Sequence, residues 1–155
     1  MAEGEHLPEG GLIARVASGI SSISAADWDA CAGTHDPFLS HVFLAALEES
    51  GSVGPGTGWQ ASPIVIEDAH AAPLGVLPAY FKGHSQGEYV FDQAWADAWQ
   101  RAGGRYYPKL QIAVPFTPAT GRRLLLRDNA APAIAPALIA AAEQLVVQQK
   151  LGSAH

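Results

Sequence analysis

Hydrophobic positions recur with a helical period most clearly near the end of the chain, over residues 136–150. Leu138, Ala142 and Leu145 fall on one face, and Glu143 and Gln148 fall on the other side. Proline does not fit a helix interior, because it lacks the N–H that bonds to the preceding turn. We therefore expect this helix to begin near Pro136 or to be kinked there.

Three shorter helices are indicated by their end signals. Ser24, followed by Asp27, matches a capping box for a helix over residues 25–32, with Ile23 and Trp28 placed as a hydrophobic staple. Ser40 is the expected N-cap of a second helix, which stops at the glycine-rich stretch 51–58. Residues 94–102 form the third pattern, which ends at a pair of glycines.

Apolar runs without a helical period predict the strands. They cover residues 12–16, 64–66, 74–81, 110–114 and 124–126, with a further short strand expected at 89–91. Residues 68–73 join two of these runs as a hairpin-like turn. Pro78 cannot donate to a strand ladder, so we expect a sheet edge or a bulge there. The mixture of helices and strands predicts an α/β (α+β) domain.

Length and composition fit one globular domain. The chain has 155 residues, of which 48% are hydrophobic, and no apolar run is long enough to span a membrane. Its single cysteine, Cys31, excludes an internal disulfide framework and favours a reducing, cytoplasmic location. Residues 1–10 lack the features of a signal peptide and are interpreted as a flexible leader.

The charge is distributed unevenly. The formal net charge is −6, which argues against DNA or other non-specific nucleic-acid partners. Residues 98–127 nevertheless contain six of the nine basic residues and no acid, so this window carries +6 and the remainder −12. We interpret the window as a binding site for an anionic small molecule or peptide. The alternative is that these side chains are solvated and pair with the acidic remainder of the surface.

The candidate chemistry outside this window is sparse. No pair of histidines has the spacing of a helical metal site, so no metal is expected. His41, in the first turn of a helix, is a candidate base, with a capping or surface role as the alternative. Six aromatic residues lie between residues 89 and 107, interleaved with basic ones. They indicate either a stacking platform for a base or part of the core, and the core interpretation is favoured.

Five segments in order carry a resemblance to a known family: 37–41, 47–53, 85–92, 106–111 and 114–118, which include Gly87-Glu88-Tyr89 and Tyr106-Tyr107-Pro108. Together they resemble the FemAB-like proteins of peptidoglycan biosynthesis or recognition, a branch of the GNAT acyltransferase superfamily. The resemblance covers nearly all of the chain after the leader. It implies a GNAT-like mixed, mainly antiparallel sheet flanked by helices, incomplete in this chain.

The resemblance also implies a function. Residues 11–155 would be the amino-terminal half of a longer protein, inactive alone, with a second GNAT-like half or a second copy as partner. The activity implied is acyl or aminoacyl transfer to an amine, such as a peptidoglycan-precursor peptide. Acyl-CoA or aminoacyl-tRNA would be the donor substrate, with no tightly bound cofactor. The alternative is a non-catalytic half that recognises cell-wall peptide or packs against another domain.

No residue matches a proven catalytic motif, and the catalytic residues stay unassigned. Residues 100–105 half-resemble the GNAT pyrophosphate loop, but Arg105 stands at its last glycine or alanine position and a strand follows instead of a helix. The strand that ends at residues 114–117, interrupted by prolines, is the expected lining of a donor cleft. The candidate residues for substrate or donor binding are Tyr107, Lys109, Gln111, Phe116, Thr117, Arg122 and His41.

Overall fold

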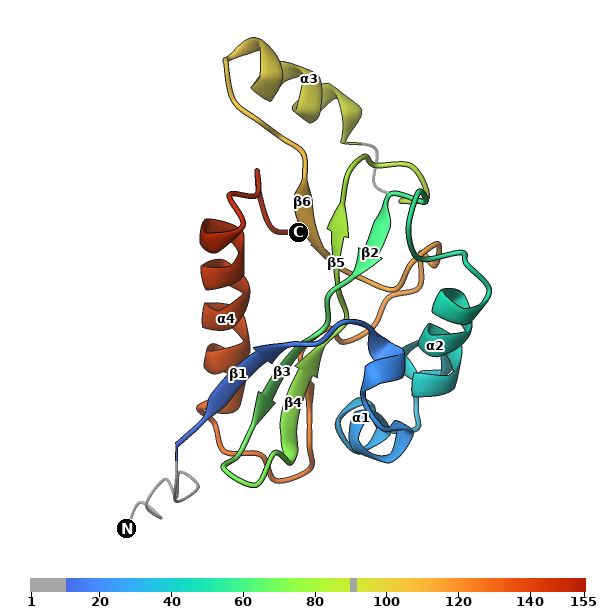
Figure 1. The fold of residues 1–155 in the computed structure, drawn as a ribbon, viewed down its shortest axis with the longest axis vertical. Helices are drawn as coiled ribbons and strands as arrows, with labels where there is room; N and C mark the ends of the chain where they lie inside the picture. Colours follow the sequence, from blue (N-terminus) through green and yellow to red (C-terminus); the bar gives the residue numbers. More distant parts are fainter. Residues whose placement is uncertain (1–10, 90–91) are drawn as a thin grey trace.

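The computed structural model describes residues 11–89 and 92–155, which form two antiparallel sheets with helices around them (Figure 1). The helices are α1 (Ala25–Ala32), α2 (His41–Glu49), α3 (Gln93–Arg101) and α4 (Ile134–Gln148), with short 3-10 helices η1 (Ile20–Ser22) and η2 (Pro37–Leu39). The strands are β1 (Ile13–Val16), β2 (Trp59–Ala61), β3 (Ile64–Glu67), β4 (Pro73–Leu77), β5 (Ala79–Lys82), β6 (Lys109–Ile112) and β7 (Leu125–Leu126). The expected α+β class with a mainly antiparallel sheet is confirmed.

The first sheet has the order β1-β3-β4-β7 and is covered on both faces. Val65 and Val76 pack in a core with α1 and α2, whereas Ile64 and Ile66 pack on the other face against α4. Successive residues of a strand point to opposite faces. A central strand between two layers of helix is therefore apolar at every position, which accounts for the β-branched run of β3.

The second sheet has the order β2-β5-β6 and continues the same hairpin. One arm of the hairpin is β2 followed by β3, and the other is β4 followed by β5. Pro78 lies between β4 and β5, where the chain passes from one sheet to the other, and its carbonyl accepts a hydrogen bond from Ala113 N at 3.1 Å. The irregularity expected at Pro78 is therefore neither a sheet edge nor a bulge: the run 74–81 divides there into β4 and β5, because proline cannot donate to the ladder and the chain passes from one sheet to the other.

The predicted helix ends of α1 and α2 are confirmed. Ser24 Oγ accepts a hydrogen bond from Asp27 N at 3.1 Å, and Ser40 Oγ accepts one from Phe43 N at 3.4 Å. Trp28 is fully buried beside Ile23, and its indole N–H donates to the carbonyl of Leu39 at 2.8 Å. These contacts fix α1 and α2 against the first sheet.

Helix α4 begins at Ile134, so Pro136 lies in the first turn, where a backbone N–H has no helical acceptor anyway. After the helix, Leu110 N donates to Ser153 O at 2.9 Å and His155 N donates to Leu110 O at 2.8 Å. Residues 153–155 thus run parallel to β6, at the open edge of the second sheet. Ile139 and Val147 of α4 are exposed, as expected for a helix with a partly uncovered apolar surface.

Helix α3 projects away from both sheets (Figure 1). Trp95 is 75% exposed and Trp99 is 55% exposed, so the interpretation of the aromatic cluster as core is wrong for this helix. Tyr106 is buried and follows that interpretation. The strand expected at 89–91 falls largely on residues 90 and 91, which lie outside the described residues.

Candidate functional site

A row of three side chains crosses one face of the second sheet. Trp59 of β2 pairs in register with Lys82 of β5, which pairs with Lys109 of β6. Both lysines are buried, at 0% and 1% exposure. A buried ammonium group is strongly destabilising unless it is paired and hydrogen-bonded, so this row requires partners.

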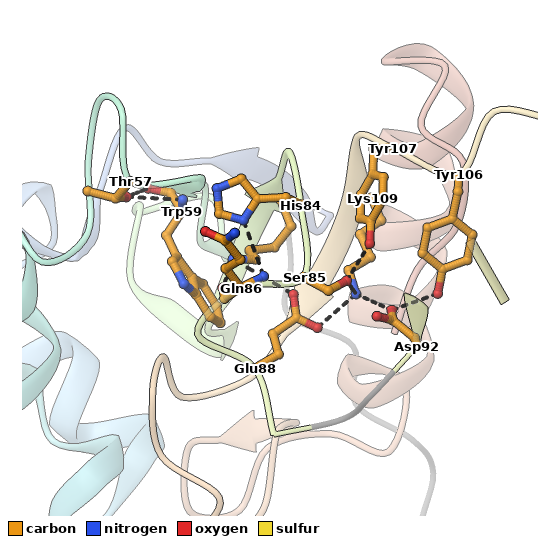
Figure 2. Close-up of polar contacts among 11 residues, drawn as sticks. Thr57, Trp59, His84, Ser85, Gln86, Glu88, Asp92, Tyr106, Tyr107 and Lys109 are labelled. Atoms are coloured by element: carbon orange, nitrogen blue, oxygen red, sulfur yellow. Dashed lines mark hydrogen bonds and ion pairs between the residues drawn. The ribbon is translucent and has the colours of Figure 1, made fainter. Parts of the chain in front are cut away.

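The partners come from the segment after β5, which folds over the row (Figure 2). The ammonium of Lys109 donates to Glu88 Oε2 at 2.7 Å, to Asp92 Oδ2 at 2.6 Å and to Ser85 Oγ at 3.1 Å. All three donor positions of the ammonium are thereby used. Lys109 therefore holds Ser85, Glu88 and Asp92 onto the sheet.

Lys82 is less well satisfied than Lys109. Its ammonium donates to the carbonyl of Gln86 at 2.9 Å and lies 3.8 Å from both Glu88 Oε1 and the centroid of the Trp59 ring. Burial lowers the pKa of Lys82 to about 8, because the charged form loses its hydration while Glu88 restores only part of that loss. The Trp59 indole N–H has no partner among the described residues.

Two tyrosines close the cluster on the β6 side (Figure 2). Tyr106 donates its hydroxyl to Asp92 Oδ2 at 2.7 Å, and the Tyr107 hydroxyl lies 2.6 Å from Ser85 Oγ. Burial alone would raise the pKa of Asp92, but hydrogen bonds from Lys109, Ser85 and Tyr106 outweigh it and lower that pKa to about 2. Burial and the Asp92 carboxylate raise the pKa of Tyr106. Asp92 is therefore a permanent carboxylate at neutral pH.

We call Lys82, Lys109, Ser85, Glu88, Asp92 and Tyr106 the buried cluster. Its two lysines and two acids balance in charge and are closed to solvent. An enclosed ammonium cannot meet a substrate without opening of the segment above it. The cluster is thus suited to fixing the shape of its surroundings.

A cleft with a volume of about 730 Å³ opens beside the buried cluster, and we call it the larger cleft. Trp59 and Gly83 belong to its lining and are also next to Lys82, so the cluster positions one wall of the cleft. The lining comprises Ser18, Glu48, Val53, Gly54, Pro55, Gly56, Gly58, Trp59, Gln60, Ala61, Phe81, Gly83 and Pro108. Among these residues Glu48 alone is ionisable.

Hydrogen bonds from η1 fix the carboxylate of Glu48 in place. Its Oε1 accepts a hydrogen bond from Ile20 N at 2.7 Å, and its Oε2 accepts from Ser21 N at 3.2 Å and Ser21 Oγ at 2.9 Å. A Cβ atom at Gly19 would lie 2.7 Å from Glu48 Oε2, so a larger residue there would displace the carboxylate from this position. The carboxylate therefore presents a fixed negative charge to the cleft.

A second cleft, of about 390 Å³, opens at the carboxyl ends of β6 and of the parallel segment 153–155. Its walls are mostly apolar, with Arg123, Glu143 and His155 at the edge. Burial and the charge of Lys109 lower the pKa of His155, which favours the neutral imidazole.

The structure brings four of the sequence-predicted residues together on the charged face of the second sheet. Lys109 and Tyr107 belong to the network around Ser85, and Gln111 shares the Lys109 side of β6, with its amide oxygen buried and unpartnered among the described residues. The ring of Phe116 lies 5.5 Å from that of Trp59. They support the sheet face and do not line the larger cleft.

The other three predicted residues lie elsewhere. Thr117 Oγ1 donates to the carbonyl of Pro115 at 3.0 Å, and Arg122 donates to the carbonyl of Ala32 at 3.0 Å. His41 Nε2 lies 3.1 Å from the carbonyl of Ile20 and 2.8 Å from that of Ile23. Carbonyls only accept, so this nitrogen carries the hydrogen, and the contacts are those of the capping role given as the alternative to a base.

The six cations of the basic window do not gather at one place. Lys109 is buried in the cluster, Arg122 contacts the end of α1, and Arg127 pairs with Asp27 at 3.6 Å. Arg105 donates to the carbonyl of Lys150 near the end of α4. This arrangement resembles the alternative of separate solvated or paired side chains more than it does a single anion site.

Sequence reasoning missed Lys82, Ser85, Glu88 and Asp92 and the cleft residue Glu48. A usable signal was present for the lysines: Lys82 ends one apolar strand and Lys109 begins another. Charged residues within such runs need acidic partners nearby. Nothing in the local pattern shows that Glu48, unlike its neighbour Glu49, turns toward η1.

Comparisons with known proteins complete the description of the site. Residues 19–155 match the FemAB-like family, which is described as peptidoglycan biosynthesis/recognition. No curated protein and no solved structure matches the chain. Among the described residues, no group of three or more His, Cys, Asp or Glu side chains is placed to hold a metal ion, and no helix is long and apolar enough to cross a membrane.

Proposed function

Since the chain belongs to the FemAB-like family of peptidoglycan biosynthesis and recognition, we propose that its larger cleft binds the amine-bearing peptide of a peptidoglycan precursor. The observation that carries this proposal is the fixed carboxylate of Glu48, the sole ionisable group in the lining. A carboxylate held in a partly enclosed cleft favours an ammonium group and disfavours an anion. For this cleft we therefore propose a ligand with a free amine, whereas the basic window in the sequence favoured an anionic ligand.

The remaining lining suits a short peptide. Phe81, Val53 and the prolines offer apolar contact, and Gln60 offers an amide for hydrogen bonding to a peptide backbone. The volume of about 730 Å³ lies within the range of clefts that hold small organic ligands. A few apolar contacts with a small number of fixed polar groups are the usual composition of such sites.

Acyl or aminoacyl transfer to that amine is the second candidate, and the second cleft favours it. Phe81 pairs with Leu110, and Ile112 lies two residues further along β6, so Phe81 and Ile112 share one face of the second sheet. Phe81 is in the lining of the larger cleft and Ile112 in that of the second, and both pack against the buried Leu110 between them.

The transfer would form a bond between the amine nitrogen and the acyl carbon and break the bond from that carbon to the donor oxygen or sulfur. The amine proton needs an acceptor, and the released alcohol or thiol needs a proton. Neutral His155 at the edge of the second cleft is our candidate acceptor. Acyl-CoA carries its acyl carbon on sulfur and aminoacyl-tRNA carries it on oxygen, so both are donors for this reaction.

Calorimetric titration of the whole chain separates binding from transfer. We expect a synthetic peptidoglycan peptide with a free side-chain amine to bind, and its N-acetylated form to bind at least tenfold more weakly. Glu48→Gln should lose about tenfold or more in affinity for the free amine, since a hydrogen bond to a charged group contributes roughly 1.5–3 kcal/mol.

Glu49→Gln is the matched control, because Glu49 is the adjacent residue of α2 and is exposed. Equal binding of the free and acetylated peptides would contradict the proposal. Heat on titration with acetyl-coenzyme A would favour the transfer candidate, and its absence would leave peptide recognition as the function supported.

A further inference from the structure

A serine and a histidine lie side by side at the second cleft. Ser153 Oγ is 2.8 Å from Nε2 of His155, and both residues belong to the segment 153–155 that runs parallel to β6. Residues two apart in an extended segment point to the same side, so the strand-like backbone brings the two side chains together. Among the described residues, no other serine hydroxyl lies within hydrogen-bond distance of a histidine ring nitrogen.

The backbone of this segment is fixed, whereas its two polar side chains are accessible. Leu110 N donates to Ser153 O, and His155 N donates to Leu110 O, so β6 holds the residues on either side of Ala154. Ser153 is half-buried and His155 is exposed, unlike the enclosed lysines of the buried cluster. A substrate can therefore reach the serine–histidine pair without opening of the fold.

The imidazole of His155 is in the state that accepts a proton. Partial burial and the charge of Lys109 lower the pKa of His155, which keeps the ring neutral near pH 7. The hydroxyl of Tyr106 lies 3.4 Å from the same Nε2 and donates its own hydrogen to Asp92 at 2.7 Å. This hydroxyl can only accept from His155, so it favours the protonated ring once a proton has arrived.

The N–H of Ala154 is available to stabilise a developing negative charge. Leu110 pairs with Ala154 in parallel register, and its hydrogen bonds go to the two neighbouring residues of the segment. In this pattern the N–H of the central residue points to the open edge of the sheet, and no backbone acceptor for it is found among the described residues. A backbone N–H directly after a nucleophile is a known type of donor to the oxyanion of acyl transfer.

The second cleft is suited to an apolar acyl group. Its apolar walls include Leu77, Ile112, Leu124 and the exposed Ile139. Its volume of about 390 Å³ lies within the range of sites that hold small organic ligands. Ala154 and His155 belong to the lining, so an acyl group in the cleft would lie next to the serine–histidine pair.

We propose that Ser153 is a nucleophile, with His155 as its general base, and that it takes the acyl group of an ester or thioester bound in the second cleft. Ser153 Oγ forms a bond to the acyl carbon while its proton passes to Nε2 of His155. The bond from the acyl carbon to the donor oxygen or sulfur breaks, and His155 gives the proton to the released alcohol or thiol. The product of this step is an acyl-serine.

The acyl-serine then gives its acyl group to an amine, and this second step alone rests on the proposed function. A bond forms between the amine nitrogen and the acyl carbon, and the bond from that carbon to Ser153 Oγ breaks. The amine proton passes through His155 to the serine oxygen, which restores the pair. One difficult transfer is thereby divided into two easier steps.

Covalent labelling of the full chain tests the proposal. The probes are p-nitrophenyl butanoate, an ester with a short apolar acyl group, and an alkyl fluorophosphonate, which reacts with activated serines. Peptide mass spectrometry locates the adduct. We expect an adduct at Ser153, none in Ser153→Ala, and labelling about a hundredfold or more slower in His155→Gln. Ser153→Cys retains an attacking atom and should restore acylation by the ester.

The matched controls are Ser52→Ala and His70→Gln. The hydroxyl of Ser52 is exposed and contacts Ser50, and His70 is exposed in the turn after β3, so both variants should be labelled like the wild type. The backbone pairing of residues 153–155 with β6 does not depend on the replaced side chains. All variants should therefore keep the circular dichroism spectrum of the wild type.

Three results would overturn the proposal: no adduct in the wild type, an adduct only at other residues, or equal labelling of the wild type and His155→Gln. Each would leave the contact between Ser153 and His155 as a purely structural one. No amine-bearing peptide takes part in this assay, so its outcome is independent of peptide binding at Glu48. Loss of peptide binding together with intact labelling of Ser153 would contradict the proposed function alone.

Discussion

The two sheets of this protein are built in different ways. The first sheet is apolar on both faces and lies between α4 on one side and α1 and α2 on the other. The second sheet buries two lysines on one face and pairs them with Glu88 and Asp92. The first is stabilised by hydrophobic burial, to which many side chains contribute, and the second depends on a small set of mutually dependent polar contacts.

This difference determines how each sheet responds to change. Removing apolar volume costs free energy in proportion to the atoms lost and the cavity left. Removing one member of a buried ion pair leaves the partner charge uncompensated, which costs more than the pair contributed. The cleft wall next to Lys82 therefore rests on the more fragile of the two sheets.

Lys109→Ala should have the largest effect on stability. It leaves Glu88 and Asp92 buried beside Lys82 alone, and breaking a buried pair typically costs about 3–5 kcal/mol. The free energy of unfolding, measured by urea denaturation, should fall by this amount. Arg101→Ala, at an exposed position without an ion pair among the described residues, should change it by less than about 0.5 kcal/mol. A loss below about 1 kcal/mol for Lys109→Ala would remove the contrast between the sheets.

Leu138→Ala tests the first sheet. Leu138 is fully buried between α4 and the sheet, so the variant should lose about 2–5 kcal/mol of unfolding free energy. Ile139→Ala, one residue further on and 48% exposed, should lose clearly less. Unlike Lys109→Ala, the Leu138 variant should show the same loss at every pH between 4 and 8, because no titrating group is removed. A pH-dependent loss would contradict purely apolar stabilisation.

Acid should weaken the second sheet through Asp92. The pKa of this carboxyl is lowered from its usual 3.8 to about 2, so the folded state binds a proton less readily than the unfolded state. The stabilisation is complete above about pH 4 and is lost as the pH falls toward 2, with a size of roughly 2 kcal/mol. Unfolding free energies at pH 2–6 should show this loss in the wild type, and a smaller one in Asp92→Asn.

Asp128→Asn serves as the control for the acid titration, because Asp128 is exposed. This variant should follow the wild-type curve. Identical pH profiles for the wild type and Asp92→Asn would show that Asp92 does not carry the acid sensitivity.

The sequence predicts the first sheet and its helices far better than the second sheet. Ser24, Ser40 and the helical period of α4 are local signals, and local signals determine helix ends and buried faces. The division of the run 74–81 at Pro78 depends on the bend of the whole hairpin, which no local pattern contains. The same is true of the parallel pairing of residues 153–155 with β6.

The candidate site was predictable only in part. Lys109 and Tyr107 were selected from a charge window and a family resemblance, but their partner Ser85 comes from a segment more than twenty residues earlier. Contacts at that separation follow from strand register, which the sequence does not fix alone. Glu48 was missed because the groups that donate hydrogen bonds to its carboxylate, the N–H groups of η1, belong to a 3-10 helix too short to be recognised from the sequence.

The central claim, that the larger cleft binds an amine-bearing peptidoglycan peptide, is tested most directly by mapping the peptide onto the protein. Amide chemical shifts of the isotope-labelled chain would be followed by NMR during titration with the free-amine peptide. We predict that the shifts concentrate at Gly54, Gln60, Phe81 and Gly83 in the wild type and largely disappear in Glu48→Gln, while Glu49→Gln retains them. Shifts confined to residues outside the cleft lining, or unchanged in Glu48→Gln, would contradict the account.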